Sequence, residues 1–144
     1  MGPKSGQCMC GAVSFTAQAV SGELGACYCD MCRRWAGSAM IGVFLERAKV
    51  DVAGAENITV FKSSDWAERA FCKVCGSGLW YHVTEGDHAA YISVPIGLFD
   101  DTSGLTLARE YFIDKRPEAL DFPEGRTQLT EAETIAMFAP DEAN

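Results

Sequence analysis

The sequence lacks the features that typify membrane proteins and nucleic-acid binders. Its longest apolar stretch, residues 36–45, contains Ser38 and is far shorter than the roughly 20 apolar residues that cross a bilayer. Basic residues are few: 12 Lys and Arg stand against 20 Asp and Glu, for a formal net charge of −8. Nucleic acids and anionic lipids both require dense positive charge, so we expect neither as a partner.

A secretion signal is also missing from the start of the chain. Residues 1–6 read Met-Gly-Pro-Lys-Ser-Gly and contain no apolar core region. We therefore expect a cytoplasmic protein. The 144 residues, 48% hydrophobic and 22% charged, are typical of one globular domain over residues 1–144, long enough to bury about 70% of its unfolded surface.

Histidines are scarce, but cysteines are abundant and clustered. The chain has only two histidines, His82 and His88, against seven cysteines. An odd number of cysteines without a secretion signal is a poor disulfide framework. The seven fall into three groups: Cys8 with Cys10, Cys27 with Cys29 and Cys32, and Cys72 with Cys75.

This grouping is typical of metal-binding thiolates. Short spacing on a tight turn lets two sulfurs reach one tetrahedral zinc ion at about 2.3 Å. Gly11 and Gly76, which follow the first and last pairs, suit such a turn. The alternatives are buried thiols or reactive redox pairs, and the spacing of Cys72 and Cys75 also fits a thioredoxin-like pair.

Seven ligands make one four-cysteine site and one three-cysteine site. The triplet Cys27, Cys29 and Cys32 supplies three ligands within six residues, so it can hold an ion alone. The two end pairs must then cooperate, and their site would contribute to folding. Three protein ligands are typical of a catalytic zinc and four of a structural zinc. The alternative for the triplet is a structural zinc completed by a residue such as His82, His88 or Asp30.

The remainder of the chain predicts a mainly β fold. Residues 12–19 alternate between apolar and polar side chains, as in a half-buried strand. Shorter runs rich in β-branched and aromatic residues predict strands over 40–45, 58–62, 69–72, 79–83, 90–94 and 107–113. Helices are predicted over 30–36 and 131–138, the second with a capping box formed by Thr130 and Glu133.

The three cysteine groups and their flanks resemble a known family. The segments are Cys8-Met9-Cys10-Gly11-Ala12-Val13-Ser14-Phe15, Cys27-Tyr28-Cys29-Asp30-Met31-Cys32-Arg33-Arg34 and Phe71-Cys72-Lys73-Val74-Cys75-Gly76-Ser77. In order and spacing they are similar to the glutathione-dependent formaldehyde-activating enzymes, the centromere protein V/Gfa family. The resemblance extends to residues 96–98 and 111–114.

The resemblance implies a single-domain, Mss4-like β-tent with zinc knuckles and two zinc ions. It assigns the structural zinc to Cys8, Cys10, Cys72 and Cys75, and the catalytic zinc to Cys27, Cys29 and Cys32. The implied activity joins formaldehyde, or a related aldehyde, to glutathione or a similar thiol. The product with formaldehyde is S-(hydroxymethyl)glutathione, and the reaction is that of a carbon–sulfur lyase run in reverse.

The sequence departs from the family at the triplet. Members usually have a histidine between the first two cysteines, where this chain has Tyr28. A phenol titrates near pH 10, so proton transfer by that side chain is placed in doubt. The anionic co-substrate would need a cation, and Arg33 is our candidate, since arginine can grip a carboxylate with two hydrogen bonds. The alternative is that Arg33 is a solvated surface charge.

Two other functions remain open from the sequence. One is a non-catalytic, zinc-stabilised binding or chaperone module, because a fold alone does not fix function. The other is a thiol redox protein that uses the triplet without metal. The aromatic residues Trp35, Trp66, Trp80 and Tyr81 could line a pocket beside the triplet or lie in the core.

Overall fold

The computed structural model describes residues 1–138 and has ten strands and two helices. The strands are β1 (Lys4–Gln7), β2 (Ser14–Ala17), β3 (Glu23–Cys27), β4 (Met40–Glu46), β5 (Val50–Ala53), β6 (Ile58–Lys62), β7 (Ala67–Cys72), β8 (Gly78–Val83), β9 (Tyr91–Pro95) and β10 (Thr106–Tyr111). The helices are α1 (Asp30–Ala36) and α2 (Glu131–Phe138). The prediction of a mainly β fold in a single small domain is confirmed.

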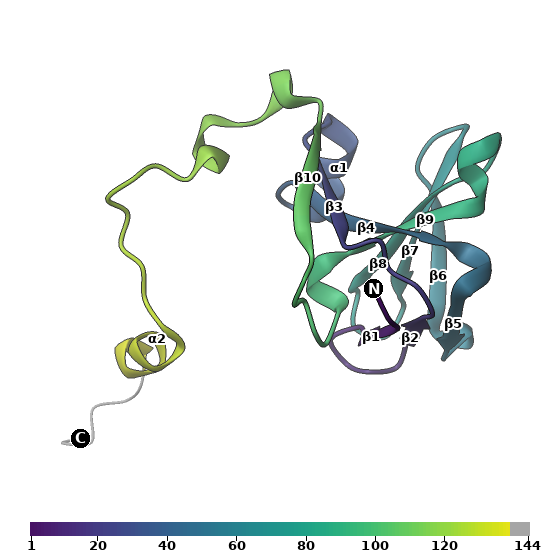
Figure 1. Cartoon of the computed structure of the whole chain (residues 1–144), viewed down its shortest axis with the longest axis horizontal. Helices are drawn as coiled ribbons and strands as arrows, with labels where there is room; N and C mark the ends of the chain where they lie inside the picture. Colours follow the sequence, from purple (N-terminus) through teal and green to yellow (C-terminus); the bar gives the residue numbers. More distant parts are fainter. Residues whose placement is uncertain (139–144) are drawn as a thin grey trace.

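The strands form two sheets that meet around a common interior (Figure 1). The smaller sheet has the order β1-β2-β5, and the larger has the order β10-β3-β4-β9-β8-β7-β6. Only β10 and β3 pair in parallel; the other pairs are antiparallel. The parallel pair sets Tyr111 opposite Cys27, so the end of β10 lies beside the triplet.

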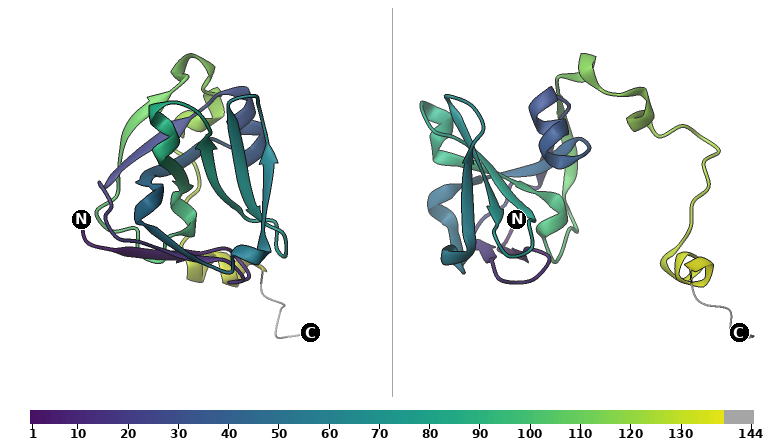
Figure 2. Two further views of the ribbon diagram at one scale, coloured as in Figure 1. Left: turned by 90° about the vertical axis from the view of Figure 1, so that its right-hand side faces the viewer. Right: turned by 180° about the vertical axis from the view of Figure 1, so that it is seen from behind.

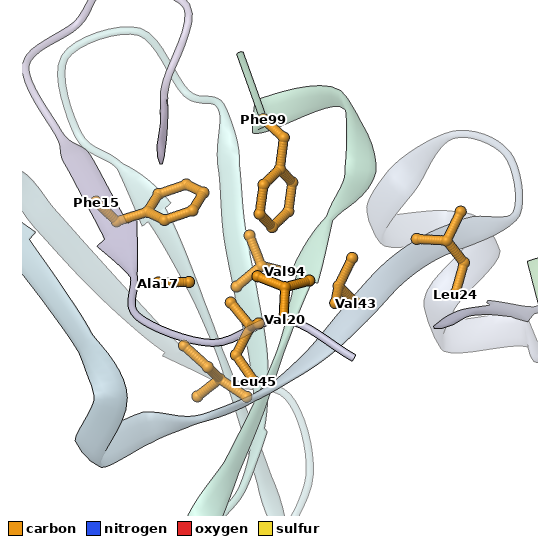
Figure 3. Close-up of a cluster of buried hydrophobic side chains, with 9 residues drawn as sticks. Phe15, Ala17, Val20, Leu24, Val43, Leu45, Val94 and Phe99 are labelled. Carbon is orange, nitrogen blue, oxygen red and sulfur yellow. The ribbon is translucent and has the colours of Figure 1, made fainter. Parts of the chain in front are cut away.

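Two apolar clusters hold the sheets together. The larger joins both sheets, and its members include Phe15, Val43, Leu45 and Val94 (Figure 3). Full burial of such a side chain contributes about 1.5–3 kcal/mol to folding. The smaller cluster comprises Cys8, Val13, Ala70, Cys72 and Leu79. Two cysteines of the end pairs are therefore part of the core itself.

Three strands went unpredicted, and one predicted strand is shorter than expected. β1, β3 and β5 were missed because their sequences, such as Glu-Leu-Gly-Ala-Cys in β3, contain glycine, alanine or polar residues of low strand propensity. Pairing with neighbouring strands overrides that local preference. The strand predicted over 12–19 is reduced to β2, because residues 8–13 form the turn that carries the first cysteine pair. The strand predicted over 107–113 ends at Tyr111, before Phe112, which has a left-handed backbone.

Both predicted helices are present with well-defined caps. The sulfur of Cys29 accepts a hydrogen bond from the backbone N–H of Cys32 at the start of α1, and Gly37 ends the helix with φ of 74°. At α2, Thr130 and Glu133 exchange the two hydrogen bonds of a capping box, at 3.0 and 3.2 Å.

The chain leaves the two sheets after β10. Residues 112–138 run away from the body and carry α2 at a distance from it (Figures 1 and 2). Between residues 100 and 138 no side chain is buried. One domain over residues 1–144 therefore stays a prediction, and the last six residues lie outside the described part. No helix among residues 1–138 is both long enough and apolar enough to span a membrane.

Candidate metal centres

The two end pairs of cysteines come together in one four-sulfur cluster. Cys8 and Cys10 lie in the turn after β1, and Cys72 and Cys75 lie at the end of β7 and in the following turn. All four sulfurs lie within 4.8 Å of one another, with Cys8–Cys10 at 3.7 Å and Cys10–Cys72 at 3.9 Å. Sulfurs around a tetrahedral zinc at about 2.3 Å are about 3.8 Å apart, so this donor set fits zinc.

The turn that carries Cys75 is shaped to present its sulfur. Gly76 has φ of 81° and donates its N–H to the carbonyl of Cys72 at 2.8 Å, which closes the turn. Ser77 contacts the sulfur of Cys75 at 3.2 Å, and this hydrogen bond lowers the pKa of the Cys75 thiol to about 5. The hydroxyl of Ser77 also accepts the N–H of Met9, which ties the two turns together.

The triplet forms a second cluster at the junction of β3 and α1. Cys27 ends β3, Cys29 caps α1 and Cys32 lies in the first turn of the helix. The three sulfurs lie within 4.8 Å of one another, and no histidine or acidic residue among residues 1–138 joins them as a fourth donor. The cluster could hold a metal ion with one coordination position left open.

None of the three residues considered as a fourth ligand joins the triplet. His82 is buried, with Nδ1 at 3.0 Å from a carboxylate oxygen of Glu68 and Nε2 at 2.9 Å from the carbonyl of Ala89. Both ring nitrogens are therefore used. Asp30 forms ion pairs with an arginine and a lysine, and His88 lies in the turn between β8 and β9.

Arg69 is a site residue that the sequence analysis missed. It lies on β7, is 2% exposed, and directs Nη1 and Nη2 to the sulfur of Cys32 at 3.8 and 3.6 Å. Its guanidinium carbon lies 4.7 Å from the ring centroid of Tyr81 and 6.0 Å from that of Trp35, so the charge stacks on Tyr81. Within residues 1–138 it forms no ion pair with a carboxylate. The sequence signal for this role was a single charged residue in the otherwise apolar strand predicted over 69–72.

The thiols of Cys32 and Cys27 differ in acidity. The hydrogen bond with Cys27, together with donation from the Arg69 guanidinium, lowers the pKa of the Cys32 thiol to about 5. The same hydrogen bond raises the pKa of Cys27, and burial adds to that rise. The Cys32 thiol thus ionises before the Cys27 thiol, and it lies next to a buried positive charge.

The side chains of Tyr28 and Arg33 bind acidic residues and not the sulfurs of the triplet. The Tyr28 hydroxyl donates to Glu110 at 2.7 Å, and Arg116 approaches the same carboxylate at 3.5 Å. This hydrogen bond and burial raise the pKa of the Tyr28 phenol. Arg33 pairs with Asp30 at 3.1 Å, while its Nε is buried without a partner among the described residues. The carboxylate-binding role of Arg33 stays a prediction.

A hollow of about 750 Å³ opens beside α1, and we call it the helix-side hollow. Three of the four aromatic residues singled out in the sequence line it, and the fourth, Trp66, is 53% exposed on the surface. The lining aromatics are Trp35, Trp80 and Tyr81, together with Phe71. Gly76 also lines it, so the hollow extends from α1 to the turn of the four-sulfur cluster.

Comparisons with known proteins agree with the cysteine geometry. The chain is 32% identical over 130 residues to an uncharacterised lyase of Schizosaccharomyces pombe, covering 90% of this chain and 93% of that protein. It shares its fold with a Rhodobacter sphaeroides protein of known crystal structure, at a TM-score of 0.60 and 24% identity, over 74% of this chain and 98% of the other. Residues 3–115 match the glutathione-dependent formaldehyde-activating enzyme family. The chain therefore belongs to the glutathione-dependent formaldehyde-activating enzyme family.

Proposed function

We propose that this protein joins an aldehyde to a small thiol such as glutathione at a zinc ion held by Cys27, Cys29 and Cys32. The thiol sulfur forms a bond to the aldehyde carbon, the carbonyl π pair moves to oxygen, and the proton lost from sulfur ends on that oxygen. No oxidant or reductant is consumed. In the opposite direction the reaction is that of a carbon–sulfur lyase, in keeping with the lyase name of the relative.

The observation that carries the proposal is the incomplete set of ligands around the triplet. Three sulfurs converge, His82 and Asp30 bind other partners, and no histidine or acidic residue within residues 1–138 joins the triplet. An ion with an open position would bind the thiol and favour its deprotonated form. The four-sulfur cluster, by contrast, already supplies every ligand of a structural zinc, which is the role we propose for Cys8, Cys10, Cys72 and Cys75.

The chain's own residues supply charge and orientation. Three thiolates with one divalent ion carry a net charge of −1, and buried Arg69 compensates it from 3.6 Å. Tyr81 packs against that guanidinium, and burial raises the pKa of its phenol. Tyr81 therefore stays protonated at neutral pH and can donate a hydrogen bond to an aldehyde oxygen as negative charge develops there.

Arg33 is our candidate for the carboxylates of glutathione. Its Nη2 already pairs with Asp30, but its side chain is 37% exposed and its buried Nε is free to donate, given its lack of partner within residues 1–138. A carboxylate on this guanidinium would hold the thiol near the start of α1. Tyr28 replaces the family histidine and donates to Glu110, so we assign it no role in proton transfer.

The first test is the zinc content per chain of protein purified without oxygen, measured before and after mild chelation. We expect two zinc ions, of which one is removable and is protected by glutathione. Formation of the hemithioacetal from formaldehyde and glutathione is then followed against the uncatalysed reaction, with Cys27→Ser as the matched control. We expect catalysis above background in the wild type and none in the variant.

Other outcomes identify the competing functions. Two firmly held zinc ions that glutathione does not affect, without catalysis, would contradict the proposal and indicate a binding module. A single zinc ion, with mixed disulfides at the triplet, would instead support the redox function.

A further inference from the structure

A second hollow lies on the face of the larger sheet that points away from the core, and we call it the sheet-face hollow. Its volume is about 490 Å³, within the range of about 300–1,000 Å³ that is typical of small-molecule sites. Leu24 and Val43 belong to the core cluster, so their strand neighbours Gly25 and Gly42 face the other side. Cys27 lies two residues beyond Gly25 and points to that same face.

Gly25 lines the hollow and is paired with Gly42 across β3 and β4. A Cβ at Gly25 would come within 2.8 Å of the ring of Tyr111, and a Cβ at Gly42 within 2.7 Å of the Ser93 hydroxyl. Any larger residue would displace these neighbours. Gly25 therefore lets the Tyr111 ring lie close to the sheet, where it meets Phe44 edge to face at 6.4 Å between ring centroids.

The walls of the hollow are aromatic and aliphatic. Five of the lining side chains are large and mainly apolar, and they stand beside polar residues; the five are Phe44, Tyr81, Val83, Tyr91 and Tyr111, and the uncharged polar ones are Ser21, His88 and Ser93. Phe44 and Tyr91 are 45% and 41% exposed, so large apolar surfaces stand open to solvent around one cavity. The two charged residues of the lining, Glu23 and Arg109, have opposite signs, which makes the site a poor match for the two carboxylates of glutathione.

Tyr81 joins this hollow to the triplet. It lines both the sheet-face hollow and the helix-side hollow, and Arg69 stacks on it while donating to Cys32. Tyr111, which lines the sheet-face hollow, pairs with Cys27 across β10 and β3. Two lining residues of the apolar cavity thus neighbour the candidate site of reaction.

We infer that the sheet-face hollow binds the apolar substituent of the aldehyde, so that the substrate carries an aromatic or branched aliphatic group. This inference rests on the proposed function, which supplies the reacting carbonyl group. Formaldehyde, with no substituent, would leave the cavity unused. One added methylene in an apolar pocket is typically worth about 10- to 200-fold in kcat/KM. We therefore expect kcat/KM for phenylacetaldehyde to exceed that for acetaldehyde by at least about tenfold.

The activity test compares three aldehydes with the zinc-loaded protein: formaldehyde, acetaldehyde and phenylacetaldehyde. Phe44→Ala should reduce the preference for phenylacetaldehyde over acetaldehyde, taken as the ratio of their kcat/KM values, about tenfold. Comparing this ratio between wild type and variant cancels the intrinsic reactivities of the two aldehydes. The matched control is Phe122→Ala, which removes an aromatic ring of 65% exposure outside the hollow. Tyr91→Ala serves as a second variant in case Phe44→Ala folds poorly.

A binding test separates this inference from the proposed function. The probe is 2-phenylethanol, which has the ring but no carbonyl group, and its binding is followed by calorimetry or NMR. We expect binding to the wild type and to Cys27→Ser, and at least about tenfold weaker binding to Phe44→Ala. Binding without turnover of any aldehyde would contradict the proposed function and leave the apolar site standing. Turnover of formaldehyde with no probe binding and no preference for phenylacetaldehyde would overturn the inference.

Discussion

The two cysteine clusters use the same ligand type in opposite surroundings. The four-sulfur cluster is built from segments 62 residues apart, and two of its sulfurs, Cys8 and Cys72, lie in the core at 1% and 0% exposure. The triplet comes from six consecutive residues at a strand–helix junction, and only Cys32 is buried. We therefore expect the first cluster to stabilise the fold and the second to contribute little to it.

In the function we propose, this difference separates the stability of the fold from the chemistry of the site. A metal that closes a long loop contributes its binding energy to folding, because the unfolded chain cannot assemble the site. A metal bound by three neighbouring residues restricts only a short segment of the chain. It can therefore keep an open position and a charged neighbour such as Arg69 at small cost to the fold.

The largest expected effect comes from breaking the four-sulfur cluster. Cys72→Ser should prevent stable folding, because a structural zinc contributes about 10–16 kcal/mol in small zinc domains, as much as a whole domain's stability. Cys27→Ser should fold and lose only the zinc of the triplet. Circular dichroism melts and metal content test both. Equal loss of structure in the two variants would contradict the division of roles.

The next largest effect concerns the charge beside the triplet. Arg69→Met should weaken zinc binding at the triplet about 10- to 100-fold, the usual cost of losing a group that supports metal ligands. Competition with a chelator measures the affinity, and the four-sulfur cluster of the same molecule is the internal reference.

The conservative variant separates charge from packing at this position. Arg69→Lys should recover part of the affinity, because it keeps the charge while losing the planar fork. If Arg69→Met and Arg69→Lys weakened zinc binding at both clusters equally, Arg69 would be a packing residue of β7 and not a positioning residue for the triplet.

A smaller effect on stability is expected at Tyr28. This residue lies between two cysteines of the triplet in sequence, but its hydroxyl donates to Glu110. Tyr28→Phe should destabilise the protein by about 1 kcal/mol through loss of the hydrogen bond to Glu110, with zinc content unchanged. Because the pKa of this phenol is raised, the bond's contribution is complete below pH 10 and is lost as the pH rises further.

Denaturant unfolding of wild type and variant checks this prediction. The gap in stability should be constant between pH 7 and 9 and should narrow above pH 10. A change in metal content or aldehyde turnover in Tyr28→Phe would show that the phenol acts at the triplet after all.

Local pattern was enough for much of the fold. The strands over 40–45, 58–62 and 79–83 were predicted within one residue of β4, β6 and β8, since β-branched and aromatic side chains dominate there. The capping box at α2 was also confirmed. β3 escaped prediction because pairing with β4 and β10, and not its own residues, makes it a strand.

The sequence by itself determined the division of seven cysteines into four and three, because spacing on tight turns decides which sulfurs can share an ion. Only the tertiary structure decided what surrounds them. The pairing of β7 with β8 places Arg69 beside Tyr81, where it reaches the sulfur of Cys32. The pairing of β10 with β3 places Tyr111 against Gly25 in the lining of the sheet-face hollow. These contacts join residues tens of positions apart, and register across a sheet is set by packing of the whole fold, which no local pattern encodes.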